Sequence, residues 1–294
     1  MNSVLAPAKL NLFLHINFRR PDGYHELQTL FQLLDYGDRL NFSLNTSDTI
    51  SISPSIPAVR LEDNLIYRAA LLLRNKAIAD GKQLSTMGVH IELDKILPMG
   101  GGLGGGSSNA ATTLLALNQL WDLGYSPQQL SELGIQLGAD VPVFVQGYTA
   151  YAEGIGEQLK PVALPPKWYL VIHPGCHVST AEVFSHKQLT RDTPKSKIAP
   201  ALEGDLDLLV NQSDLAVNDC EAIVCKLHPE IRQAINWLNQ FSPAKLTGTG
   251  ACIFASFADK QRADNVLSQL PTNYRGFVAK GISESPAIAE SKKL

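Results

Sequence analysis

Six glycines surround a single leucine in one segment of the chain, Pro98-Met99-Gly100-Gly101-Gly102-Leu103-Gly104-Gly105-Gly106-Ser107-Ser108-Asn109. An alanine- and leucine-rich pattern that is typical of a helix begins directly after it. Glycine has no Cβ, so its backbone N–H groups can approach a ligand closely, and a helix N-terminus attracts negative charge. The segment therefore predicts a binding site for an oligophosphate, with a mobile loop as the alternative.

This glycine segment fits neither of the two common nucleotide-binding motifs. A P-loop requires a lysine after its last glycine, and in the frame from Gly101 to Gly106 that position is occupied by Ser107. The frame from Gly100 to Gly105 matches a dinucleotide-binding turn, which must follow a strand directly and needs an acid at the end of a second strand. Here several residues separate the turn from the preceding strand-like run, and the acid at the right distance, Asp122, ends a helical pattern. A nicotinamide-dependent dehydrogenase is therefore the weaker alternative.

Length and composition limit the classes of protein to consider. The 294 residues, 45% of them hydrophobic, suffice for two ordinary domains. A formal net charge of -3 argues against non-specific nucleic-acid binding. No run is apolar enough to span a membrane and no signal peptide is evident, so we expect a cytoplasmic protein with no membrane partner. The four cysteines form no CxxC pair, so we expect reduced, structural thiols.

Near the N-terminus, apolar residues alternate with polar ones in the pattern of a half-buried strand. Lys9 and Asn11 should then lie on one face of that strand. A turn at residues 20–23 reverses the chain and places Tyr24 and His25 at its exit.

Two helices are predicted from their N-terminal caps. Asp63-Asn64 should cap a helix that runs through Ile66, Ala69, Ala70 and Leu73. Ser107 or Ser108 should cap a second helix, which ends before Gly124.

Prolines at positions 161, 165 and 166 indicate a domain boundary, which divides the chain into residues 1–160 and 161–294. The second part is predicted to contain a strand, several helices, two strands, a helix and a last strand. This is the βαββαβ order of a ferredoxin-like fold. Between its middle strands lies a second glycine turn, Thr247-Gly248-Thr249-Gly250, which taken alone is usually only a tight turn.

Three motifs, in this order and spacing, resemble those of the GHMP kinases: Pro7-Ala8-Lys9-Leu10-Asn11-Leu12, the glycine segment Pro98 to Ala110, and Leu246-Thr247-Gly248-Thr249-Gly250-Ala251. The likeness extends over nearly the whole chain. It implies an α+β fold of two domains, an N-terminal ribosomal-protein-S5-like domain and a C-terminal ferredoxin-like domain, with the active site in the cleft between them.

The resemblance implies that ATP phosphorylates the 2-hydroxyl of a cytidine-diphosphate-linked methylerythritol, a step of non-mevalonate isoprenoid synthesis. Tyr24 and His25, beside an Asp-Gly turn, favour this acceptor over mevalonate, homoserine or a sugar. A non-catalytic nucleotide sensor is a further alternative, against which the presence of both Asp140 and Lys9 argues. The partners are small molecules, and a monomer or a weak homodimer is compatible with the sequence.

The resemblance assigns the catalytic roles to Asp140 and Lys9. Asp140 would accept the hydroxyl proton late in the transfer, and Lys9 would lie near that carboxylate and stabilise the transferring oxygens. From the sequence alone, a turn or helix cap is the commoner role for an aspartate before Pro142, and a solvated strand edge is the commoner place for a lysine.

The resemblance also implies how the acceptor binds. Tyr24 stacks on the cytosine, and Phe184 covers its other face with Thr180 nearby. His25 hydrogen-bonds the base, and Asn11 bonds the erythritol hydroxyls. Without the resemblance, Tyr24 would be predicted as a half-buried hairpin residue and Phe184 as part of the core.

For ATP, the resemblance places Asn64 and Lys95 around the adenine and residues 98–108 around the phosphates. Magnesium is expected because ATP carries it and the ion bridges phosphate oxygens. No carboxylate ligand for this ion can be assigned from the sequence, so its ligands stay unassigned, with Ser107, Ser108 and water as the candidates. The prolines, lysines and serine of residues 191–200 predict a surface loop.

Overall fold

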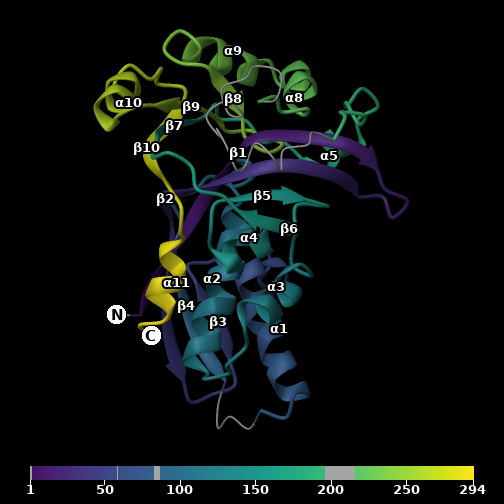
Figure 1. Cartoon of the computed structure of the whole chain (residues 1–294). Helices are drawn as coiled ribbons and strands as arrows, with labels where there is room; N and C mark the ends of the chain where they lie inside the picture. Colours follow the sequence, from purple (N-terminus) through teal and green to yellow (C-terminus); the bar gives the residue numbers. More distant parts are fainter. Residues whose placement is uncertain (1, 58, 83–86, 196–215) are drawn as a thin grey trace.

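A computed structural model describes residues 2–57, 59–82, 87–195 and 216–294 (Figure 1). The strands are β1 (Ser3–Arg19), β2 (His25–Asn45), β3 (Ile50–Ser53), β4 (Gly88–Asp94), β5 (Ala150–Glu153), β6 (Gln158–Pro161), β7 (Trp168–His173), β8 (Ala244–Leu246), β9 (Ile253–Phe257) and β10 (Arg275–Ile282). The helices are η1 (Leu61–Asp63), α1 (Leu65–Ala79), α2 (Gly105–Leu120), α3 (Pro127–Gly134), α4 (Val141–Gln146), α5 (Thr180–Ser185), α8 (Glu221–Leu227), α9 (Pro229–Leu238), α10 (Lys260–Leu267) and α11 (Pro286–Ser291). None of the helices in these four ranges has both the length and the apolar character that crossing a bilayer requires.

The long antiparallel hairpin of β1 and β2 lies at the centre of the molecule (Figure 1). The predicted turn between the strands is confirmed, because the Gly23 N–H donates to the Arg20 carbonyl at 3.1 Å. The strand prediction is also correct, but its half-buried character is wrong, since Lys9 and Asn11 are buried like the neighbouring Leu10 and Leu12. The reason is that the polar face is covered: the Lys9 N–H donates to the Leu103 carbonyl of the glycine segment at 3.0 Å.

The second half of the chain confirms the predicted βαββαβ order. Its strands lie side by side in the order β10-β7-β9-β8, and all neighbours are antiparallel. This is the arrangement of a ferredoxin-like sheet, with the first and last strands adjacent. Helix α9 contacts β8 and β9, and α10 contacts β7, β9 and β10.

Strand pairing joins the two halves of the molecule, in addition to the chain connection between them. β10 pairs with β7 along most of its length and then, through Gly281 and Ile282, with β2. Helix α11 follows and returns to the first half, where Ala287 packs in the same core cluster as Val4 and Leu114. These contacts fix the position of the ferredoxin-like sheet against the β1–β2 hairpin.

Helices α1 and α2 confirm one predicted cap and correct the other. Asn64 caps α1, with its Oδ1 accepting from the Ile66 N–H at 2.9 Å. Helix α2, however, begins at Gly105 after Gly104 in a left-handed conformation, so neither Ser107 nor Ser108 is its cap. No side chain caps this helix, and the N–H groups of its first turn have no partner within the helix.

Candidate active site

The glycine segment owes its shape to three glycines with positive φ. Gly100, Gly102 and Gly104 have φ values of 64°, 73° and 71°, which other residues rarely adopt. A Cβ on Gly102 would lie 2.2 Å from the Thr247 carbonyl oxygen, and one on Gly104 would lie 2.8 Å from the Phe144 ring. The glycines are therefore required by backbone conformation and by close packing together.

The second glycine turn packs directly on the first segment. The N–H groups of Ala251 and Cys252 donate to the carbonyls of Gly100 and Gly101, both at 3.1 Å. The buried Thr247 hydroxyl donates to the Gly102 carbonyl at 3.3 Å and accepts from the Asn11 N–H at 3.0 Å. Thr247 thus connects the three motifs that lie far apart in the sequence.

A cavity of about 640 Å³ opens where these motifs meet. Of the residues predicted to form the site, those in its wall are Lys9, Asn11, Asn64, Lys95, Pro98, Met99, Gly100, Gly101, Gly102, Leu103, Gly104, Gly105, Gly106, Ser107, Asp140, Thr180, Phe184, Gly248 and Thr249. Five others are not among its lining residues: Tyr24, His25, Ser108, Thr247 and Gly250. The structure therefore brings the predicted nucleotide and catalytic residues together around one space.

Lys9 and Asp140 face each other in this cavity. The Lys9 Nζ lies 3.4 Å from the Asp140 Oδ2, and the lysine side chain is 3% exposed whereas the aspartate is 33% exposed. The same Nζ donates to the Asn11 Oδ1 and lies 5.4 Å from the centre of the Phe31 ring. Lys9 is therefore a buried cation rather than a solvated edge lysine.

Asp140 stands at the N-cap position of α4, but its side chain makes no capping hydrogen bond. Its carboxylate is instead directed to Lys9 and to the cavity. The role of helix cap, which is the commoner one for such an aspartate, is thus not the role seen here.

Lys95 is held by an acid that the sequence analysis missed. Asp38, which is fully buried, accepts from the Lys95 Nζ at 2.8 Å and from the Asn109 Nδ2 at 2.9 Å. Its other oxygen accepts from the backbone N–H groups of Ile96 and Leu97. No signal of this role was present in the sequence beyond the acidic residue itself.

The predicted nucleobase residues lie at the hairpin end and on α5. Tyr24 is 59% exposed, so it is not the half-buried hairpin residue that its position alone suggested. The His25 ring lies 5.0 Å from the Phe184 ring between centroids, with an interplanar angle of 31°. Thr180 shares a 2.9 Å hydrogen bond with Thr249, which ties α5 to the second glycine turn.

Arg191 is a second residue that the sequence analysis missed. Its Nε donates to the His25 Nε2 at 3.0 Å, and one terminal nitrogen donates to the Phe184 carbonyl at 2.8 Å. Burial lowers the pKa of His25, and the nearby cations of Arg191 and Arg19 lower it further. The described residues 191–195 lie outside helices and strands, and Asp192, Pro194 and Lys195 are exposed, as the predicted surface loop requires, but Arg191 is partly buried. Residues 196–200 of that predicted loop lie outside the described residues.

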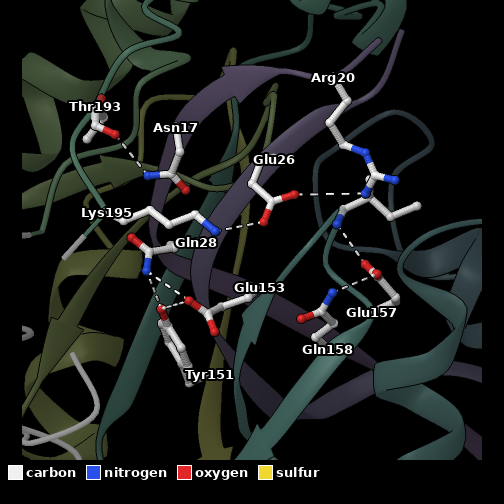
Figure 2. A network of polar contacts seen from close by, with 11 residues as sticks. Asn17, Arg20, Glu26, Gln28, Tyr151, Glu153, Glu157, Gln158, Thr193 and Lys195 are labelled. Atoms are coloured by element: carbon white, nitrogen blue, oxygen red, sulfur yellow. Dashed lines mark hydrogen bonds and ion pairs between the residues drawn. The ribbon is translucent and has the colours of Figure 1, made fainter. Parts of the chain in front are cut away.

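Figure 2 shows how polar contacts anchor the chain next to Arg191 to the central hairpin. The Asn17 Nδ2 donates to the Thr193 carbonyl at 2.9 Å, and the Lys195 Nζ lies 2.8 Å from the Glu26 Oε1. Further along β2 the Gln28 Nε2 donates to the hydroxyl of Tyr151, on the neighbouring strand β5, at 2.6 Å. Residues 191–195 are therefore attached to the same strands that carry His25.

Comparisons with known proteins agree with this geometry. The model of the GHMP kinases N terminal domain matches residues 64–148, and that of the GHMP kinases C terminal region matches residues 198–276. A 4-diphosphocytidyl-2-C-methyl-D-erythritol kinase of Hahella chejuensis is 63% identical over 98% of this chain and 96% of its own length. The chain belongs to the GHMP kinase family.

Other GHMP kinases support the same conclusion. A kinase of the same name from Tolumonas auensis is 55% identical over 96% of this chain and 93% of its own length. The crystal structure of a 4-(cytidine 5'-diphospho)-2C-methyl-D-erythritol kinase superposes with a TM-score of 0.80 at 34% identity, covering 96% of this chain and all of the other. A mevalonate kinase structure, at a TM-score of 0.68 and 16% identity, shows the shared fold alone. The predicted GHMP kinase fold is confirmed, and these relatives favour the cytidine-linked acceptor over the other acceptors and over a dehydrogenase.

Proposed function

We propose that this GHMP kinase transfers the γ-phosphoryl group of ATP to the 2-hydroxyl of 4-diphosphocytidyl-2-C-methyl-D-erythritol, in the non-mevalonate route of isoprenoid synthesis. The observation that carries this proposal is the Lys9–Asp140 pair, 3.4 Å apart, in the same cavity as the glycine segment. Relatives of this name, 51% to 63% identical over nearly the whole chain, support the choice of acceptor.

The glycine segment and the start of α2 are proposed to bind the triphosphate of ATP. The N–H groups of Gly105, Gly106 and Ser107 have no partner within the helix, and they point along its axis towards the segment. An anion at this end is stabilised by these donors and by the helix dipole. Asn64 and Lys95, which line the same cavity, are proposed to lie around the adenine.

Mg²⁺ is proposed to arrive with ATP, where it neutralises charge on the phosphate oxygens. The side chains at this end of the cavity fit such a hard cation because they offer oxygen donors. The Ser107 hydroxyl, on the first turn of α2 and in the cavity wall, is the proposed protein ligand, with water completing the shell.

The transfer itself needs little more than positioning and charge stabilisation, because the transition state for phosphoryl transfer is loose. Asp140 is proposed to accept the proton of the 2-hydroxyl as the new P–O bond forms, and the bond to the leaving ADP oxygen breaks. The Lys9 ammonium, fixed by Asn11 and the Phe31 ring, stabilises the charge on the transferring oxygens. Asn11 is proposed to bind the erythritol hydroxyls from the same strand face.

The acceptor's cytosine is proposed to lie between Tyr24 and Phe184, with its edge bonded by His25 and with Thr180 nearby. The exposed ring of Tyr24 is available for stacking, and Phe184 already lines the cavity. We further propose a domain boundary between residues 160 and 161, a cytoplasmic location where ATP is supplied, and a monomer or weak homodimer.

The proposal is tested by ADP release from the purified protein with four acceptors in parallel: the cytidine-linked alcohol, mevalonate, homoserine and galactose. We expect a clear preference for the first, and ³¹P NMR of the product should place the new phosphate on the 2-hydroxyl. A higher kcat/KM for any of the other three acceptors would overturn the proposed substrate.

A further inference from the structure

The guanidinium of Arg191 lies between two walls of the proposed nucleobase site. Its Nε donates to the His25 Nε2 at 3.0 Å, and its terminal nitrogens donate to the carbonyls of Phe184 at 2.8 Å, His186 at 2.9 Å and Leu189 at 3.2 Å. A guanidinium has five N–H donors and no acceptor, and it stays protonated in proteins. The His25 Nε2 must therefore be the acceptor in its bond with Arg191.

This bond determines which nitrogen of His25 carries the proton. A neutral imidazole has one donor and one acceptor nitrogen, so an accepting Nε2 leaves the hydrogen on Nδ1. A protonated ring would place two N–H groups against each other, so the bond with Arg191 requires the neutral ring, and the lowering of the His25 pKa by burial, Arg191 and Arg19 acts in the same direction. Within the described part of the chain, no hydrogen-bond partner is found for Nδ1. The Nδ1–H group is thus the one side-chain donor of His25 that is left without a partner in the described part of the chain.

From this arrangement we propose that Arg191 is a specificity-determining residue, which makes the enzyme select cytosine over uracil by fixing His25 as an Nδ1–H donor. The inference rests on the proposed function, which brings a cytidine diphosphate to His25. Cytosine has an acceptor at N3, whereas uracil has an N–H donor there. A fixed Nδ1–H donor can therefore bond the N3 of cytosine, whereas it would meet the N3–H donor of uracil. Without Arg191 the ring can shift its proton to Nε2 and accept from uracil.

The position of Arg191 is itself secured by neighbouring contacts that do not involve the base. Thr193 is bonded to Asn17, and Lys195 pairs with Glu26 on the strand that begins at His25 (Figure 2). The chain therefore offers a matched control, since Lys195→Ala loosens the same segment at an exposed ion pair but leaves the guanidinium and His25 untouched.

The test compares the binding of CDP and UDP by isothermal titration calorimetry in the wild type, Arg191→Met and Lys195→Ala. We expect the wild type to bind CDP about 10- to 100-fold more tightly than UDP, since a buried donor would be left unsatisfied by uracil. In Arg191→Met the ratio should fall to within about threefold of unity, whereas Lys195→Ala should keep the wild-type ratio. Because both affinities are measured on one preparation, their ratio is unaffected by any loss of active protein. Weaker binding of both nucleotides in equal proportion leaves the ratio unchanged and would therefore count against the inference.

An unchanged CDP-to-UDP ratio in Arg191→Met would overturn the inference, as would an equal fall in Lys195→Ala. Long-range ¹⁵N–¹H NMR of the imidazoles provides a readout that needs no ligand, with His25→Gln identifying the signals. We expect His25 to be the Nδ1–H tautomer in the wild type and to gain Nε2–H in Arg191→Met. An Nε2–H ring in the wild type would refute the proposal.

These measurements separate the inference from the proposed function. If the wild type phosphorylates mevalonate and not the cytidine-linked alcohol, the proposed function fails in the acceptor assay. The tautomer of His25 and the preference for CDP over UDP still decide the role of Arg191.

Discussion

Replacing Asp38 by asparagine should test how the ATP side of the cavity is held. The Asp38 carboxylate is fully buried and accepts four hydrogen bonds of 2.8 to 2.9 Å. Two come from the backbone of residues 96 and 97, and two from the side chains of Lys95 and Asn109. An asparagine keeps one oxygen and presents an NH₂ group in place of the other. At least one pair of donors must then lose its acceptor.

The arrangement decides which pair is lost. The Asn109 Oδ1 lacks a hydrogen-bond partner among the described residues, so that amide can turn over and accept from the new NH₂ group. The Lys95 ammonium has no acceptor atom to turn towards the new NH₂ group, so the two donors would face each other. A hydrogen bond to a charged group contributes about 1.5–3 kcal/mol, and breaking a buried ion pair costs about 3–5 kcal/mol. Because Lys95 is 23% exposed, water solvates its ammonium and offsets part of this cost. We therefore expect Asp38→Asn to lower the free energy of unfolding by about 3 kcal/mol.

Thermal unfolding and ATP kinetics measure this effect together. A loss of about 3 kcal/mol should lower Tm by about 6–12 °C in a chain of this size. The KM for ATP should rise, because Lys95 lines the cavity. Asp35→Asn is the matched control on the same strand. Among the described residues the exposed Asp35 accepts only from the Lys280 N–H, and an asparagine oxygen can still do so. If Asp38→Asn has the same Tm and the same KM for ATP as Asp35→Asn, the buried carboxylate does not position Lys95 and residues 96 and 97.

Three further changes give separate predictions. Asp140→Asn should lower kcat by about 10²- to 10⁴-fold with the KM for ATP nearly unchanged, and near-normal turnover would remove Asp140 from the mechanism. Tyr24→Ala should weaken acceptor binding by about 1–3 kcal/mol with little change in Tm, because the ring is 59% exposed; a lower Tm with an unchanged acceptor KM would argue for a packing role. Gly102→Ala should lower Tm and raise the KM for ATP more than Gly81→Ala, since both have φ near 70° but only a Cβ at Gly102 meets the Thr247 carbonyl, at 2.2 Å; equal effects would contradict this.

Much of the architecture could be predicted because it depends on local pattern and motif order. The alternation of residues near Lys9 predicted β1, and the second half of the chain predicted the ferredoxin-like strand order. The three motifs predicted that Lys9, the glycine segment and Thr247 belong to one site. The domain boundary and the roles of the site residues stay predictions.

The missed residues are those whose contacts span long stretches of sequence. Asp38 bonds Lys95 and Asn109, which lie 57 and 71 positions away, and Arg191 bonds His25 across 166 positions. No period or turn signal carries information over such distances. An aspartate such as Asp38 and an arginine such as Arg191 are more often exposed on the surface. Their buried partners can be found only in the tertiary structure.

The wrong prediction for the start of α2 has a physical reason that bears on function. Serine, asparagine or aspartate side chains cap α1, α3, α5, α10 and α11, so a side-chain cap is the commoner start of a helix in the described part of this chain. At α2 the two serines lie one turn too late, and glycines stand where a capping side chain would. A side-chain cap would occupy the N–H groups that a phosphate needs. Helices α4, α8 and α9 also lack a side-chain cap, but α2 begins in the wall of the cavity that Lys9 and Asp140 line, where we propose that its free N-terminal donors bind the phosphates.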